Sequence, residues 1–199
     1  MLGLAVLVLA ACSGDGGDDA APASTTVATS VPATTPPAAT TPTSSCPGFV
    51  GSTTVLTSVG PTAPGSLIDA QAGANGCLDQ VTFTFNGAGI PPGYTVGYEN
   101  PDEKPFLDGD PPEPISLPGA AFLVVRITPA LSFDPFAEDM ARTYRGNLSL
   151  EYGAHQHLQI VRELPDAQNT VVWVIGLDSL RPFRVDRAED PKRVTVYIG

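Results

Sequence analysis

Apolar and polar residues alternate in several short stretches of the second half of the chain. In residues 80–85, Val81, Phe83 and Phe85 fall on one face and polar side chains fall on the other. The same alternation recurs in three more stretches, 94–99, 183–186 and 194–198. A period of two residues is typical of a strand with one buried face, so each stretch is predicted to be a β-strand.

Two other stretches, 121–127 and 171–175, are apolar on both faces. This pattern predicts central strands that are covered on both sides. Turn-forming residues such as Asn86-Gly87, Leu117-Pro118-Gly119 and Asp190-Pro191 separate the predicted strands. Many short strands with turns between them predict an all-β fold, an antiparallel β-sandwich.

Only the stretch from Asp134 to Arg145 has a helical pattern. Asp134 can cap a first turn that contains Pro135, and residues 137–142 are reasonable helix formers. The sandwich is therefore expected to contain at most one short helix.

The first residues form a targeting signal. Residues 1–11 are an apolar run that ends in Ala10 and Ala11, and it is too short to cross a bilayer, which takes about 20 apolar residues. Leu9-Ala10-Ala11-Cys12 resembles the bacterial lipobox, which implies cleavage before Cys12 and acylation of its thiol. Residues 1–11 are thus interpreted as a lipoprotein signal peptide. Signal peptides carry a basic residue before the apolar run, and none is present here, so a start codon further upstream is expected.

Residues 12–45 are rich in Ala, Thr, Pro, Ser and Gly and contain almost no large apolar side chains. Such a segment cannot bury enough surface to offset its ordering entropy, so it is predicted to be a disordered stalk after the lipidated Cys12. Residues 46–199 then form the folded domain.

The charge distribution agrees with this division. No Lys or Arg precedes Lys104, and the net charge of the chain is -11. Nucleic acid is excluded as a partner because binding to phosphates needs clustered cations, and an anionic bilayer surface would repel the protein. Attachment to the outer face of the cell membrane is therefore assigned to the lipid on Cys12, since two or more acyl chains hold a protein there stably.

Lipidation of Cys12 leaves Cys46 and Cys77 in an oxidising compartment. A disulfide between them is predicted, and two buried free thiols are the alternative. The bridge would fix the start of the domain to its first strong strand.

Residues 79–87, 93–98, 171–185 and 190–198 together resemble the AMIN-like domain of actinobacterial secreted proteins and lipoproteins. That domain is related to the AMIN module found beside cell-wall amidases and secretins. The resemblance covers about residues 50–199 and implies a β-sandwich that targets cell-envelope glycan, without catalytic residues.

Two groups of residues contain side chains that could bind a metal ion. His155 and His157 would share one face of a strand, but no third ligand is near in sequence, so a solvated edge is favoured. Asp108 and Asp110 lie among six acids between Glu99 and Glu113, but without the spacing of a calcium-binding EF-hand, so a solvated acidic loop is favoured. Neither a metal nor a cofactor is predicted.

Candidate ligand-binding residues lie in the last part of the chain. Arg184 is predicted to point away from the core and, with Arg181 and Asp178, to contact a wall polymer; ordinary surface ion pairs are the alternative. Trp173 can stack on a sugar ring, although its place in an apolar stretch favours the core.

The predicted function is that of a lipid-anchored lipoprotein whose AMIN-like domain binds cell-envelope glycan such as peptidoglycan. The first alternative is a scaffold subunit that docks an envelope enzyme through an exposed sheet edge or face. The second is a hydrolase with paired carboxylates, but nucleophile motifs are missing and an enzyme is not expected.

Overall fold

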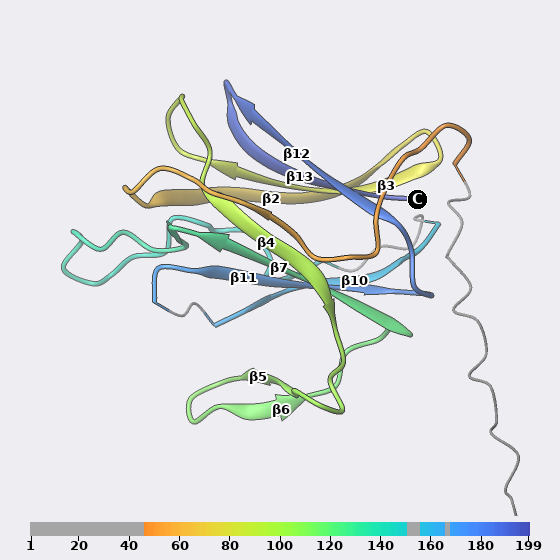
Figure 1. The fold of residues 1–199 in the computed structure, drawn as a ribbon. Helices are drawn as coiled ribbons and strands as arrows, with labels where there is room; N and C mark the ends of the chain where they lie inside the picture. Colours follow the sequence, from red (N-terminus) through yellow and green to blue (C-terminus); the bar gives the residue numbers. More distant parts are fainter. Residues whose placement is uncertain (1–45, 151–155, 166–167) are drawn as a thin grey trace, which may run out of the picture. The chain divides into compact units, whose positions relative to one another are not determined.

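The computed structural model describes residues 46–150, 156–165 and 168–199, which form thirteen β-strands (Figure 1). The strands are β1 (Leu56–Ser58), β2 (Gly65–Asn75), β3 (Leu78–Phe85), β4 (Gly93–Glu99), β5 (Phe106–Asp108), β6 (Glu113–Ile115), β7 (Ala121–Thr128), β8 (Ala130–Leu131), β9 (Ser149–Leu150), β10 (Leu158–Leu164), β11 (Val171–Leu177), β12 (Phe183–Glu189) and β13 (Lys192–Ile198). Cys12 and the predicted stalk lie outside the described residues.

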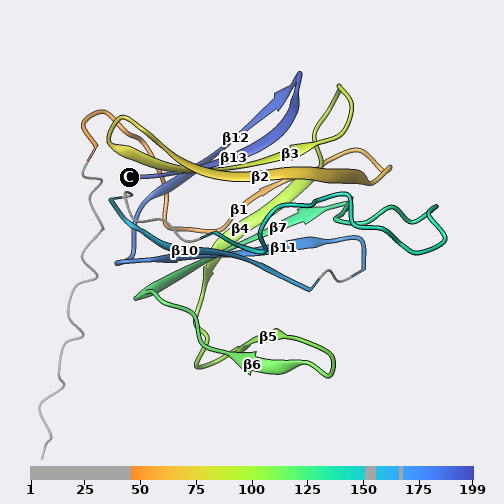
Figure 2. The same cartoon turned by 180° about the vertical axis from the view of Figure 1, so that it is seen from behind.

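Two sheets pack face to face in the folded domain (Figures 1 and 2). One has six strands in the order β1-β4-β7-β11-β10-β9, and the other has five in the order β12-β13-β3-β2-β8. The strand pairs in the described residues are antiparallel except for the short pair of β2 with β8. The prediction of an all-β antiparallel sandwich is confirmed.

The alternation in the sequence defines the core between the sheets. Every second residue of β3 is buried, and Phe83 packs against Trp173 of the opposite sheet with ring centroids 5.5 Å apart. Each such side chain contributes about 1.5–3 kcal/mol when it is fully buried. The core between the layers therefore supplies most of the driving force for folding.

The six-stranded sheet is also covered on its outer face. A hairpin of β5 and β6 places Phe106 over Val124 and Val174, which form a second apolar cluster. This explains why β7 and β11 are apolar on both faces: Leu123 and Ile175 face the five-stranded sheet while Val124 and Val174 face the hairpin.

The predicted helix at Asp134–Arg145 is wrong, because this stretch forms turns in a loop between β8 and β9. Phe133 and Arg142 pair in an isolated antiparallel bridge, so the chain must reverse between them. A helix would instead carry Arg142 about 13 Å away from Phe133. Asp134 does accept a hydrogen bond from the backbone N–H of Phe136, but this bond closes a turn rather than capping a helix.

The predicted disulfide is present. Cys46 and Cys77 are bonded, with their Cα atoms 5.3 Å apart. Cys77 lies in the turn between β2 and β3, so the bridge fixes the start of the domain to the five-stranded sheet. Ser52 then bridges to Phe183 of β12, and β1 pairs with β4, so the segment after Cys46 runs from one sheet to the other.

Candidate functional site

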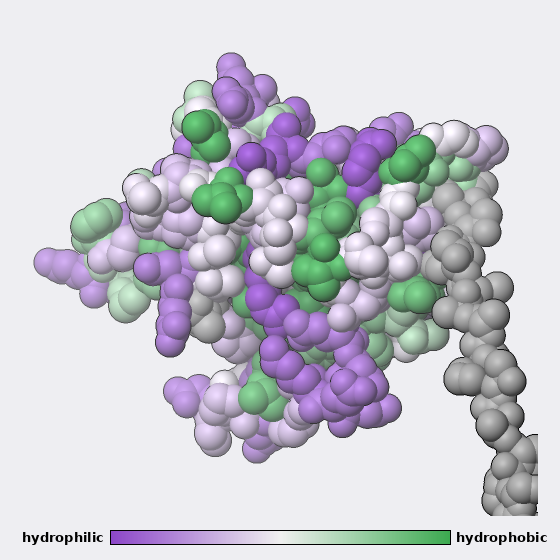
Figure 3. Space-filling model, viewed as in Figure 1, coloured by the Kyte–Doolittle hydropathy of each residue, from purple (hydrophilic) through white to green (hydrophobic). Residues whose placement is uncertain are grey.

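The β5–β6 hairpin leaves a groove of about 850 Å³ at one end of the six-stranded sheet. Three segments line it: residues 98–103 and 105–106, from the end of β4 to the start of β5; residues 115–117 and 119–122, from the end of β6 to the start of β7; and Leu180, after β11. Figure 3 shows hydrophilic side chains where the hairpin meets the sandwich. A groove of this size with mixed polar and apolar walls is the default candidate for a ligand site.

The floor of the groove is apolar. Phe106 of the hairpin packs edge-on against Phe122 of β7, with ring centroids 5.5 Å apart. Ile115 and Leu117 join this cluster, and Leu180, which also lines the groove, is 47% exposed. The floor is thus part of the cluster that holds the hairpin on the sheet.

A glycine fixes the segment that closes the groove between β6 and β7. A Cβ on Gly176 of β11 would lie 2.2 Å from the carbonyl oxygen of Pro118, so only glycine allows this close approach. Gly119 adopts a φ of 143°, which side chains rarely tolerate. The Pro118-Gly119 turn can therefore lie directly on β11.

Acidic side chains form one rim of the groove. Glu99, Asp102 and Glu103 line it, and Asn100 organises them by accepting the backbone N–H of Asp102 on its side chain at 3.1 Å. The backbone carbonyl of Asn100 also accepts the N–H of Lys104 at 3.0 Å. The rim is thus a turn with a defined conformation.

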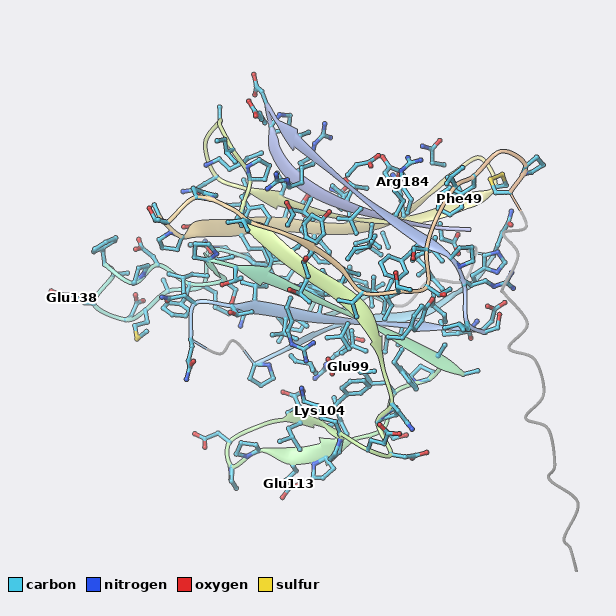
Figure 4. All side chains as sticks on the ribbon, viewed as in Figure 1. Phe49, Glu99, Lys104, Glu113, Glu138 and Arg184 are labelled. Carbon is cyan, nitrogen blue, oxygen red and sulfur yellow. A yellow bond between two sulfur atoms is a disulfide. The ribbon has the colours of Figure 1, made fainter. Side chains whose placement is uncertain are left out.

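Glu99 is paired with cations. Its carboxylate accepts two hydrogen bonds from Arg126, one of them at 3.0 Å, and Lys104 Nζ lies 3.7 Å away (Figure 4). Burial acts to raise the pKa of Glu99, but the hydrogen bond and charge of Arg126 outweigh it and lower the pKa below its ordinary value. Among the described residues, no Lys or Arg lies within salt-bridge distance of Asp102 or Glu103.

Tyr98 also lines the groove, and its hydroxyl makes two hydrogen bonds to the backbone of Arg181. It donates to the carbonyl of Arg181 at 2.7 Å and accepts the N–H of Arg181 at 3.0 Å. Burial raises the pKa of Tyr98 to about 12. The ring packs edge-on against Phe183 of the five-stranded sheet, with ring centroids 5.9 Å apart, so Tyr98 is fixed at the edge of the main core.

Two of the predicted ligand residues, Asp178 and Arg181, bind one another next to Tyr98. Arg181 holds Asp178 through two hydrogen bonds of 3.2 and 3.0 Å, and Asp178 also accepts from His157 Nδ1 at 3.2 Å. Burial alone would raise the pKa of Asp178, but the hydrogen bonds from Arg181 and His157 lower it to about 2. Arg181 thus binds Tyr98 through its backbone and Asp178 through its side chain, and neither Arg181 nor Asp178 lines the groove.

The other two predicted ligand residues are elsewhere. Arg184 is exposed, as predicted, but it pairs with Asp186 and lies over the rings of Phe49 and Tyr197 at 5.7 and 5.1 Å from their centroids. Trp173 is completely buried, so its assignment as a sugar-stacking residue is wrong and its place in the core is confirmed. The four residues therefore do not form one site.

The structure also changes the interpretation of His157. This residue is only 6% exposed, so the predicted solvated edge is wrong for it; His155 lies outside the described residues. The backbone N–H of His157 donates to the buried carboxylate of Asp79 at 2.7 Å. Residues 46–150, 156–165 and 168–199 contain no group of three or more metal-ligating side chains close enough to hold an ion.

The acidic stretch is not simply a solvated loop. Asp108 accepts a hydrogen bond from Arg162 of β10, which lowers the pKa of this carboxyl. Sequence reasoning missed these ion pairs because Arg126 and Arg162, the partners of Glu99 and Asp108, lie on the separate strands β7 and β10. It missed the groove because the groove forms only where the hairpin folds onto the sheet. The density of acids beside Tyr98 and Phe106 was the available signal.

In the described part of the chain, no helix is long and apolar enough to cross a membrane. Comparisons with curated proteins and with solved structures gave no match. A family model for the AMIN-like domain matches residues 65–199, most of the folded domain, from β2 to the last strand. By this match, the chain belongs to the AMIN-like domain family.

Proposed function

We propose that this protein is a lipid-anchored, non-catalytic binding module of the cell envelope, and that its groove holds a segment of wall glycan. Membership of the AMIN-like family indicates a cell-envelope targeting or binding role outside the cytoplasm. The groove beside the β5–β6 hairpin is the observation that supports a ligand in this domain.

The chemistry of the groove suits a sugar. A pyranose ring has C–H groups that pack on an apolar surface and hydroxyl groups that donate hydrogen bonds around its edge. Phe122 and Leu180 provide apolar surface, and Asp102 and Glu103 provide carboxylate acceptors on the rim. Both acids are exposed, and although Glu103 accepts a hydrogen bond of 3.4 Å from the Asn100 side chain, each carboxylate keeps further acceptor sites toward solvent.

Binding is favoured over hydrolysis by the electrostatics of Glu99. A glycosidase needs a carboxylic acid with a raised pKa to protonate the leaving group. Glu99 is the least exposed acid of the rim, and Arg126 lowers its pKa instead. The groove therefore resembles a recognition site more than a pair of catalytic carboxylates.

The lipid anchor is inferred from the sequence alone. Leu9-Ala10-Ala11-Cys12 resembles a lipobox, and residues 13–45 have the composition of a flexible spacer. Acyl chains on Cys12 would hold the domain at the outer face of the membrane, from which the stalk lets it reach the wall. Cys12→Ser should release the protein from the membrane fraction, and globomycin should block its processing; an unchanged distribution in both experiments would contradict the anchor.

A sedimentation assay with purified peptidoglycan tests the glycan ligand. The variant D102N/E103Q/L180S neutralises the two rim carboxylates and removes the apolar side chain of Leu180. It changes none of the buried residues. Its retention should fall by about tenfold, as expected when central contacts of a binding site are lost. The matched control D110N/E113Q removes two acids of the same hairpin region outside the groove and should bind like the unmodified protein. Equal retention of both variants would remove the groove from the proposal.

A further inference from the structure

The loop between β8 and β9, residues 132–148, exposes large apolar side chains at a protruding position. Phe136 is 95% exposed and Met140 is 56% exposed. Figures 1 and 2 show the loop extending well beyond the ends of the strands, and Figure 4 places Glu138 at its outer end. Two large apolar side chains exposed together on one protruding loop form an apolar surface of the kind that marks protein-interaction sites.

The tip of this loop has a defined conformation. The backbone N–H of Asp134 donates to the carbonyl of Ala141 at 2.8 Å, and that of Met140 donates to the carbonyl of Ala137 at 3.0 Å. Met140 has a φ of 48°, a conformation that glycine adopts more easily. The sequence thus keeps a large apolar side chain where the backbone alone would favour glycine.

The base of the loop is fixed to the sandwich. Thr143 donates its hydroxyl hydrogen to the carbonyl of Leu67 at 2.7 Å, and Arg142 pairs with Glu163 at 2.5 Å. Tyr144 is buried against Trp173 with ring centroids 5.6 Å apart. Because the loop is held at both tip and base, Phe136 can enter a partner with little loss of backbone entropy.

The charged residues at the tip of the β8–β9 loop indicate the charge that a binding partner must have. Asp134, Glu138 and Asp139 lie at the tip beside Phe136, whereas the two cations of the loop, Arg142 and Arg145, lie at its base, where Arg142 pairs with Glu163. The whole chain carries a net charge of -11. An anionic bilayer would repel such a tip. A second copy of this chain would also be disfavoured, because the groove into which Phe136 could insert has an acidic rim as well.

We propose that the Phe136–Met140 tip is a docking element for an envelope protein that has an apolar pocket bordered by Lys or Arg. Phe136 fills the pocket, Met140 packs at its edge, and Glu138 pairs with the basic border. Phe and Met are enriched in the buried centres of protein interfaces relative to the rest of the surface.

This docking element is separate from the groove. Strand β7 begins at the groove with Ala121 and ends at Thr128, and only β8 lies between it and the loop. The two surfaces are therefore at opposite ends of a strand about 25 Å long. One domain can hold a wall ligand and a protein at the same time, and the docking element does not depend on the identity of the wall ligand.

Site-specific photo-crosslinking in cells that produce the full chain tests the proposal. A photoreactive phenylalanine analogue replaces Phe136, and the control carries it at Val59, which is 90% exposed but outside the loop. We expect one dominant protein adduct from position 136 that is absent from position 59. Its yield should fall by about tenfold when Glu138→Lys is added and should also fall at high salt.

Mapping the crosslinked residue of the partner completes the test. The proposal requires an apolar pocket with adjacent Lys or Arg at that residue. It is overturned if position 136 gives no more adduct than position 59, if the adduct is with lipid or a second copy of this chain, or if Glu138→Lys leaves the adduct unchanged. Trp173 fluorescence of each variant shows that the fold is intact, and binding to peptidoglycan should remain, which separates this result from a failure of the groove.

Discussion

Asp79 offers a sharp test of how the two sheets are joined. Its side chain is completely buried at the start of β3 and accepts the backbone N–H groups of His157 and Leu158 at 2.7 and 3.1 Å, as well as that of Gln156 at 3.3 Å. These donors precede and begin β10, which belongs to the other sheet. The carboxylate therefore connects the two layers at one end of the sandwich.

The cost of Asp79→Ala follows from these contacts. His157 and Leu158 are both buried, so their N–H groups would lose an acceptor without gaining water. Each buried donor without a partner costs about 1–3 kcal/mol, which gives roughly 4 kcal/mol for the two. This is a large share of the about 5–15 kcal/mol by which a domain is usually stable. Asp79→Asn keeps one oxygen for both donors and should cost only about 1–2 kcal/mol.

Urea unfolding followed by the fluorescence of Trp173 measures these differences, because this residue is the only tryptophan and lies in the core. Asp69→Ala is the control, since Asp69 accepts from Gln71 at an exposed position and should change stability by less than about 0.5 kcal/mol. A loss below about 1 kcal/mol for Asp79→Ala, or an equal loss for the Asn and Ala variants, would refute the reasoning.

Three further predictions concern the β5–β6 hairpin, the carboxyl of Asp178 and the disulfide. Phe106→Ala should destabilise the protein by about 3 kcal/mol in urea unfolding and abolish peptidoglycan retention, while Leu107→Ala on the exposed side of β5 should do neither. Asp178 has a folded pKa of about 2 against an ordinary 3.8, so its stabilisation is complete above about pH 4 and disappears as the pH falls toward 2. Since the carboxyl is 34% exposed, solvent screening reduces this contribution to about 1 kcal/mol, and Asp178→Asn should flatten that part of the stability-against-pH curve. Cys46→Ser with Cys77→Ser should lower the unfolding free energy by about 3–4 kcal/mol, because the bridge closes a loop between residues 31 positions apart; an unchanged urea midpoint would contradict this loop-entropy argument.

Local patterns of apolar and polar residues were sufficient to predict the main strands of the core. The stretches 80–85, 94–99, 121–127, 171–175, 183–186 and 194–198 correspond to β3, β4, β7, β11, β12 and β13. Side chains at every second position of a strand point to the same face, so a sequence that alternates must bury one face whichever strands it pairs with. The doubly apolar pattern of β7 and β11 likewise predicted cover on both sides before the hairpin was known.

Other elements left a weaker local signal. β2 contains many Gly, Ala and Ser residues, and its register shifts between Leu67 and Asp69, so no regular alternation marks it. The Asp134–Arg145 stretch has acceptable helix propensity. The pairing of Phe133 with Arg142, however, requires the chain to reverse direction between them, and helix propensity does not predict such a contact.

The sequence by itself determined the all-β class, the main strands and the pairing of Cys46 with Cys77, because strand alternation and disulfide chemistry depend on residue types and compartment. Only the tertiary structure decided which side chains form a site. Arg126 reaches Glu99 and Arg162 reaches Asp108 across strands that the topology brings together, while Arg181 and Arg184, close in sequence, bind different acids. A groove depends on where strands from distant parts of the chain end in space, and the pattern within any one strand carries no information about that.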